Sequence, residues 1–474
     1  MTQVVERTVV DVRQEADALG VRRGGRRPRK SPPVMVMDDA GVPTILEISE
    51  DNLAHAFARH FRDKLRFDHT SGKWFVWNDV RWQRNETRKA SDWVRRFVGQ
   101  MNADGQAKWA KAAVFAAVET IASRDQTLAV TLDIFDRDPW LLGTPGGIVN
   151  LRDGSLSKPN PAKMISKSTA VVPAAPGTVP IRWVEFLQEA TRHDAGLVRF
   201  LQQVLGYSLT GLTIEQILLF VYGPGGNGKG VFLNTTTRLL GDYAQTADMR
   251  TFTASKHDRH STELAALAGA RLVTAVETER DQALAESRLK QLTGGDPIRA
   301  RFMRCDEFEF MPQFQLVMVG NYKPRIRAVD QAWRRRLNLV NFMHQPTHVN
   351  PHLSEQLMAE GPAILRWMID GCLDWQANGL IRPQSVIDAT AEYFSEQDLF
   401  ASWLSERCNT GTQLAGGATA LYQSWSEFAR AAGEDAGTQT AFGAELDRRG
   451  YAKERGMAGV RRRGLALKPS PEHA

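Results

Sequence analysis

The residues best suited to chemistry lie in the octapeptide GPGGNGKG at positions 223–230. A phosphate-binding loop reads G-x-x-x-x-G-K followed by Ser or Thr, whose hydroxyl is a ligand of Mg²⁺. Here Gly230 stands where that hydroxyl is expected, and Lys229 would contact the β- and γ-phosphates. We therefore predict a site for ATP and Mg²⁺; the alternative is a glycine-rich turn with one exposed lysine. The predicted nucleotide contacts are Gly223, Pro224, Gly225, Gly226, Asn227, Gly228, Lys229, Gly230 and Val231.

Polar residues also follow two apolar runs further along the chain. The run 271–277 leads into Glu277 and Glu279, and the run 314–321 ends in Asn321. The carboxyl ends of parallel strands lie at one edge of a sheet, so these side chains would face the glycine-rich loop. Glu277 would bind Mg²⁺, the second acid would polarise the attacking water, and the amide would orient that water. The alternatives are solvated strand ends and an ordinary turn asparagine.

A basic hairpin is predicted between those two strands. Arg299 and Arg301 alternate with apolar residues, which predicts an apolar face and a basic face, and Arg304 lies near the expected tip. Together with Lys290, these residues suit contact with a nucleic-acid backbone; the alternative is a charged solvent-exposed face.

Three consecutive arginines at 334–336 follow the third strand. Arg335 and Arg336 are candidates for stabilising a transferred phosphoryl group, most plausibly in a neighbouring subunit. The alternatives are surface charge and a sequence-independent contact with DNA phosphates.

The elements that position these residues alternate between strand and helix, which predicts an α/β fold with a mainly parallel sheet. The strand at 215–222 runs into the loop and then into a helix, which is the context that a phosphate loop requires. We predict a disordered basic arm at 1–49, a smaller α/β domain at 50–200, an ATPase core at 201–395 and a small domain at 396–474.

Composition and charge narrow the classes of function. The net charge is +6, with six basic residues at 22–30 and eight, against one acid, at 448–468. Basic ends of this kind favour a nucleic-acid partner, and Arg461, Arg462 and Arg463 are the predicted DNA contacts in the second stretch. We find no apolar run long enough to span a membrane, no secretory signal and no paired cysteines, so a cytoplasmic location is expected.

Taken in order, these motifs resemble a known family. GPGGNGKG, RLVTAVETE, LKQLTGGDPIRARF, LVMVGNYKPRIR and RRLNLVNF are similar to the motifs of superfamily 3 helicases. More narrowly, they resemble the phage and plasmid primase–helicase family, which is related to the poxvirus replicative helicase–primase. The resemblance covers residues 50–470, including a C-terminal stretch similar to the family's winged-helix segment.

The resemblance implies an AAA+-like ring, usually a hexamer, that moves along single-stranded or forked DNA. It assigns Lys229 to the phosphate loop, Glu277 and Glu279 to the Walker B positions, Asn321 to the sensor and Arg335 or Arg336 to the finger. It also places Thr293, Asp296, Arg299 and Arg301 in the hairpin motif. Family members with a fused primase carry a long N-terminal catalytic domain, and only about 50 residues precede the shared region here. We therefore expect no primer synthesis by this chain, and a separate primase or loader is a possible partner.

Three functions agree with these patterns. The first is an ATP-dependent DNA helicase of phage or plasmid replication. The second is a DNA-binding ATPase that loads or remodels replication proteins without unwinding. The third is a DNA-binding scaffold with a degenerate nucleotide site. ATP turnover stimulated by DNA separates the third from the others, and strand displacement separates the first from the second.

Overall fold

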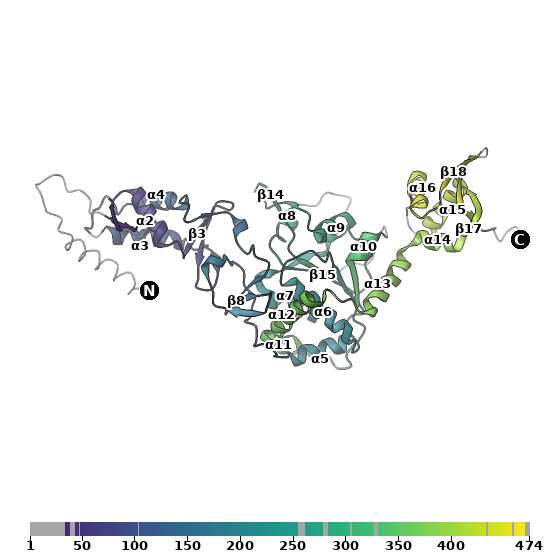
Figure 1. Cartoon of the computed structure of the whole chain (residues 1–474), viewed down its shortest axis with the longest axis horizontal. Helices are drawn as coiled ribbons and strands as arrows, with labels where there is room; N and C mark the ends of the chain where they lie inside the picture. Colours follow the sequence, from purple (N-terminus) through teal and green to yellow (C-terminus); the bar gives the residue numbers. More distant parts are fainter. Residues whose placement is uncertain are drawn as a thin grey trace, which may run out of the picture.

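The structure is a computed structural model in which the chain runs from an N-terminal part through a central sheet to a C-terminal part (Figure 1). It describes residues 34–37, 43–46, 48–102, 104–254, 261–277, 283–303, 306–326, 330–432, 435–456 and 459–469.

Among its described residues, the N-terminal part contains three α-helices and a four-stranded sheet with the strand order β5-β4-β3-β6. Apolar residues at helical spacing, such as Leu53, Phe57, Val94 and Phe97, form one buried cluster with Trp74 of the sheet. A separate antiparallel hairpin, β1–β2, lies inside the range predicted as a disordered arm, so that part of the prediction is wrong. The elements are β1 (Val34–Met37), β2 (Pro43–Leu46), α2 (Glu50–His60), β3 (Leu65–Asp68), β4 (Lys73–Trp77), β5 (Trp82–Arg84), α3 (Lys89–Met101), α4 (Ala112–Ser123) and β6 (Ala129–Val130).

The central part is built on five parallel strands in the order β11-β12-β15-β10-β16. Alternate residues of one strand face opposite sides, as the period of a strand requires. In β10, Leu219 and Val221 join one buried cluster, whereas Leu218 and Phe220 join the other. The elements of this part are β10 (Leu218–Tyr222), α7 (Lys229–Leu240), β11 (Ala244–Asp248), α8 (Ser261–Ala265), β12 (Leu272–Val276), α9 (Glu286–Gly294), β13 (Ile298–Arg301), β14 (Glu307–Phe310), β15 (Gln315–Gly320), α10 (Gln331–Arg336) and β16 (Leu337–Asn341).

Elements before residue 200 complete this core. Trp183 of α5 and Phe200 of α6 are fully buried in the same cluster as the sheet, and α6 packs along α12. The domain boundary predicted at residue 200 therefore does not separate two buried cores, because α5 and α6 pack against the sheet. These elements are β7 (Leu141–Thr144), β8 (Gly147–Asn150), β9 (Ser155–Ser157), α5 (Ile181–Ala190), α6 (Ala195–Ser208), α11 (Leu353–Ala359) and α12 (Gly361–Asn378).

The C-terminal part follows the long helix α13 and has its own buried cluster around Trp403, Trp425 and Phe442. Its sheet is antiparallel with the strand order β17-β19-β18. The elements are α13 (Gln384–Gln397), α14 (Leu399–Arg407), β17 (Cys408–Gly417), α15 (Ala418–Ala431), α16 (Gln439–Arg448), β18 (Lys453–Gly456) and β19 (Gly459–Leu467).

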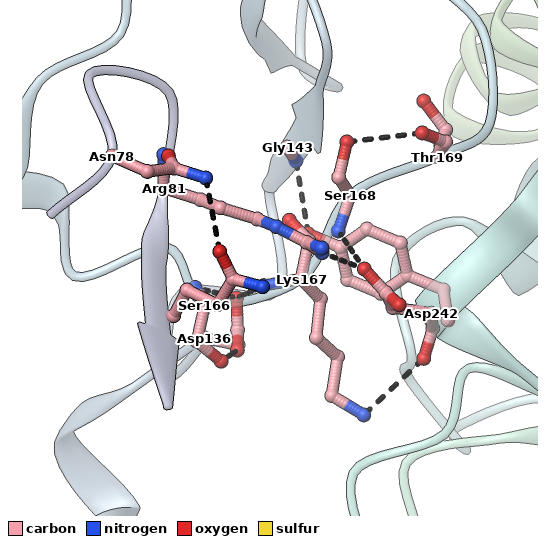
Figure 2. A network of polar contacts seen from close by, with 11 residues as sticks. Asn78, Arg81, Asp136, Gly143, Ser166, Lys167, Ser168, Thr169 and Asp242 are labelled. Atoms are coloured by element: carbon pink, nitrogen blue, oxygen red, sulfur yellow. Dashed lines mark hydrogen bonds and ion pairs between the residues drawn. The ribbon is translucent and has the colours of Figure 1, made fainter. Parts of the chain in front are cut away.

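A polar network joins the N-terminal part to the end of α7, the helix that begins in the glycine-rich loop (Figure 2). Asp242, just after α7, forms an ion pair with Arg81 and accepts a hydrogen bond of 3.0 Å from the backbone N–H of Ser168. Lys167 donates to the carbonyl of Asp242 at 3.4 Å, and burial lowers the pKa of this lysine. The far end of α7 is thus fixed against residues 166–169. No helix among the described residues combines the length and apolarity needed to cross a membrane.

Candidate nucleotide site

The glycine loop (residues 223–230) joins the carboxyl end of β10 to the first turn of α7, as the sequence predicts. Gly223 has φ 149° and Gly228 has φ 86°, conformations that favour glycine. A Cβ at Gly223 would overlap the carbonyl oxygen of Phe342, and one at Gly228 would lie 2.6 Å from Cε2 of Phe186. Both glycines therefore allow close packing of the loop against other segments.

Lys229 is turned into the loop and is 7% exposed. Its Nζ donates to the carbonyls of Gly223 (2.6 Å) and Pro224 (3.0 Å) and to Oδ1 of Asn227 (2.9 Å). Burial lowers the pKa of Lys229. The ammonium group is thus held inside the loop by three neutral oxygen atoms and has no carboxylate among these partners.

At Gly230, as at Gly225 and Gly226, nothing lies within 4 Å of a Cβ built on the backbone, and Gly230 also lacks the positive φ of Gly226. No described segment therefore packs closely against Gly230. A Cβ, the first atom of a serine side chain, therefore fits at this position without displacing any described residue.

Strand register places Glu277 and Asn321 at the level of the loop. Tyr222, the last residue of β10, pairs with Gly320, and Asn321 follows directly in an exposed position. Glu277 donates its backbone N–H to the carbonyl of Val319 at 2.8 Å. The second predicted acid, Glu279, lies outside the described residues.

The carboxylate of Glu277 lies over Gly320, where a Cβ would overlap its Oε2. No group of three or more His, Cys, Asp or Glu side chains that could hold a metal occurs in the described parts of the chain. Mg²⁺ is commonly held by one or two carboxylates together with phosphates and waters, so a single Glu277 beside a phosphate loop fits this ion.

The two candidate finger arginines have different environments. Arg336 is 9% exposed, and it donates from Nε to Thr293 Oγ1 and from Nη1 to the carbonyl of Ala332, both at 3.2 Å. Burial lowers the pKa of Arg336, and the charge of Arg335 adds to this effect. Arg335 is exposed, and its guanidinium makes no hydrogen bond or ion pair within the described part of the chain.

The predicted hairpin is present as β13–β14, and Ile298 and Ala300 are buried as expected. The expected basic face is wrong, because acids of β14 lie directly opposite the arginines of β13. Arg299 pairs with Glu309 at 2.8 Å, and Arg301 is opposite Glu307.

The two other predicted DNA contacts near the hairpin are Lys290 and Arg304. Lys290 forms an ion pair with Asp330, the residue that caps the N-terminus of α10. Arg304 lies outside the described residues, next to the exposed Phe302 and Met303.

The three arginines of β19 divide into two groups. Arg461 and Arg463 are exposed, whereas Arg462 is 5% exposed and forms an ion pair with Asp447. Arg462 also donates to the carbonyls of Tyr451 (3.1 Å) and Gly443 (2.9 Å). Arg462 therefore fixes β19 to α16 and is wrongly predicted as a DNA contact.

Sequence reasoning missed the segment after β16 that holds the loop. Asn227 donates to the carbonyl of Phe342, and Gln345 donates to the carbonyl of Gly225 at 2.6 Å. It also missed α5, where Phe186 packs on Gly228. No local motif marks these residues, because their positions depend on contacts between distant segments.

Two family models match separate segments of the chain. The family described as "D5 N terminal like" matches residues 54–192, from within α2 to just after α5. A family of unknown function, DUF5906, matches residues 221–336, from the glycine loop to the end of α10. A solved structure titled as the apo C-terminal region of NrS-1 is 12% identical, with a TM-score of 0.48, and covers 85% of this chain and 96% of that chain.

Curated relatives come from large DNA viruses. A protein of frog virus 3 (isolate Goorha), named as a putative helicase, is 29% identical over 45% of this chain and 24% of its own length. A second of that name, from Acanthamoeba polyphaga mimivirus, is 23% identical over 57% of this chain and 31% of its own length. A protein of African swine fever virus (strain Badajoz 1971 Vero-adapted), named as a putative primase, is 24% identical over 47% and 24%.

The chain thus spans about a quarter to a third of the length of these curated relatives. The D5-type segment is followed along the chain by the segment that matches DUF5906. The chain is a member of the phage and viral primase–helicase family.

Proposed function

We propose that this chain is an ATP-dependent DNA helicase that forms a ring, most plausibly a hexamer, and separates DNA strands. The observation that carries the proposal is the glycine loop between β10 and α7, with Lys229 turned into it and Glu277 and Asn321 at the same edge of the sheet. Phosphate loops bind the phosphates of a nucleotide in this arrangement.

Each residue of the site has a separate role in this proposal. Lys229 exchanges its three loop oxygens for phosphate oxygens when ATP binds. The backbone N–H groups at the start of α7 and the positive end of its dipole bind the same phosphates. Glu277 holds Mg²⁺, which supplies neutralisation of the phosphate charge, and Asn321 orients the attacking water.

Arg335 completes the site of a neighbouring subunit. The sequence does not decide between Arg335 and Arg336 as the finger, and of these two only Arg335 is exposed. It lies after β15, far along the chain from Lys229. The adjacent Arg336 anchors α10 through Thr293, so that Arg335 is presented from a fixed helix end.

The C-terminal part is the proposed DNA anchor. Its order of helix, strand, two helices and two strands is that of a winged helix, and the β18–β19 hairpin exposes Arg455, Arg461 and Arg463. Exposed arginines on a hairpin bind phosphates without reading sequence.

ATP turnover with and without single-stranded or forked DNA tests the proposal at its first step. We expect turnover that rises when DNA is added. Turnover that is absent under both conditions would favour a DNA-binding scaffold. An ATPase that loads replication proteins without unwinding would also show turnover stimulated by DNA. A strand-displacement assay distinguishes that function from a helicase.

The metal site makes a prediction about Gly230 and Glu277. Gly230→Ser is expected to stay active and to lower the Mg²⁺ concentration for half-maximal turnover, because a serine Cβ fits there and a hydroxyl at this position is a usual Mg²⁺ ligand. Glu277→Ala is expected to lose nearly all turnover even at high Mg²⁺. The measurement is the ATPase rate against Mg²⁺ concentration for the wild type and both variants.

Two results of this titration would contradict the assignment. An inactive but folded Gly230→Ser protein would mean that the space at this position is needed when nucleotide is bound. An active Glu277→Ala protein would mean that another acid holds the metal.

The arginines of β19 give a second prediction. The variant Arg461→Ala/Arg463→Ala is expected to lower the salt slope of log DNA affinity by about 1.8, since each phosphate contact adds about 0.9. Arg462→Ala serves as the contrast: it removes the bonds to Asp447, Tyr451 and Gly443, so it should lower the melting temperature. DNA affinity measured at several salt concentrations decides, and an unchanged slope in the double variant would place the DNA grip elsewhere.

A further inference from the structure

A cavity of about 440 Å³ opens beside the glycine loop. Three segments form it: α5, the loop at Gly226 to Gly228, and residues 344–356 before and within α11. Its volume lies within the range of roughly 300–1,000 Å³ that is usual for small-molecule sites. Because the start of α7 binds phosphates in the proposed function, a bound nucleotide would extend its sugar and base into this space.

Contacts among the three segments fix the walls of the cavity. Arg182 donates from Nη1 to Oε1 of Gln356 at 3.2 Å, and Asn350 donates to the same oxygen at 2.9 Å. The carboxylate of Glu360 caps α5 by accepting from the backbone N–H groups of Arg182 and Trp183. The cavity is thus bounded by segments that already hold one another.

The lining combines apolar surface with two acids, and it also includes Arg182, His344 and His348. Phe186 and Val231 lie on the side of the loop, and Leu353 lies on α11. Glu185 and Glu189 are one helical turn apart on α5, and both are exposed to the cavity and solvent. Ionised carboxylates only accept hydrogen bonds, and they repel phosphates.

We propose that this cavity holds the nucleobase, and that Glu185 and Glu189 select adenine by accepting hydrogen bonds from its exocyclic amino group. The apolar side chains contact the faces of the ring. The inference rests on the proposed function, since it assumes that the loop binds the phosphates.

Hypoxanthine is the sharpest probe, because inosine triphosphate differs from ATP only in the base. Its O6 is an acceptor where adenine has an amino donor, so it would face the carboxylates with a lone pair. Binding measured by calorimetry with Mg²⁺ is expected to favour ATP over inosine triphosphate by about 10-fold or more, since a hydrogen bond to a charged group is lost. Inorganic tripolyphosphate, which has no base, reports the loop alone.

Glu185→Gln/Glu189→Gln is the decisive variant. Its amides both donate and accept, so the ratio of the two nucleotide affinities should fall towards one while tripolyphosphate binding changes little. Glu355→Gln is the matched control, because Glu355 lies on α11, is 82% exposed and is not part of the lining. This control should keep the wild-type ratio.

Three outcomes would overturn the inference. Equal affinity of the wild type for both nucleotides would show that the base is not selected by its amino group. An unchanged preference in the double glutamine variant would place the selection elsewhere. If the wild type bound neither nucleotide nor tripolyphosphate, the glycine loop would not be a nucleotide site. Only this last outcome would also reject the proposed function.

Discussion

Replacement of Arg335 by alanine is expected to lower ATP turnover by about 10³-fold or more in the assembled protein. Arginine fingers that act on a neighbouring site contribute about 10³ to 10⁵ in kcat by stabilising the charge of the transferred phosphoryl group. Arg335 is an exposed arginine in the last turn of α10, and the fold has little need of its side chain. The melting temperature of this variant should therefore stay close to that of the wild type.

Neighbouring arginines provide matched controls. Arg334→Ala removes an equally exposed charge whose guanidinium lies 5.1 Å from the ring centre of Phe394, and it should change turnover only a few-fold. Arg336→Ala should instead lower the melting temperature, because it breaks the buried bonds to Thr293 and Ala332.

Mixing experiments show whether Arg335 acts in trans. When Arg335→Ala subunits are added to wild-type protein, activity should fall faster than simple dilution predicts. A strictly linear dilution curve, or an equal loss in Arg334→Ala, would contradict the assignment of Arg335 as the finger.

Lys229→Ala is the second substitution with a large expected effect. Removing one charged donor from a phosphate site costs about 10²–10³ in kcat or more. The ammonium of Lys229 is held inside the glycine loop by Gly223, Pro224 and Asn227. ATP turnover and the melting curve are measured together.

Lys229→Arg is the companion variant, because it keeps the charge. A guanidinium is planar and larger than an ammonium, and Lys229 is 7% exposed among three oxygens, so turnover should remain strongly impaired. Full activity in either folded variant would mean that the glycine loop does not bind the phosphates.

The elements that carry the nucleotide site were predictable because their signals are local. The strands at 215–222, 271–277 and 314–321 are apolar runs, and the structure contains β10, β12 and β15 there. Two other strands of the same sheet were missed. β11 reads AQTAD at a sheet edge, and β16 alternates Leu and Asn directly after a run of arginines, so neither has a clear apolar run.

Contacts between distant segments were not predictable. The sequence cannot show that Glu309 would neutralise Arg299, since the register of β13 and β14 decides this pairing. Nor can it separate Arg462 from its neighbours: the alternation of β19 directs Arg462 towards α16, whereas Arg461 and Arg463 stay exposed. β17 is rich in glycine and forms a strand only because β19 lies beside it.

Strand displacement on a forked DNA duplex tests the central claim most directly. With ATP and Mg²⁺, the wild-type chain is expected to release the labelled strand, and Lys229→Ala under the same conditions is expected to release none. A wild-type protein that hydrolyses ATP in response to DNA and still leaves the fork intact would contradict the helicase assignment and favour an ATPase that loads or remodels replication proteins.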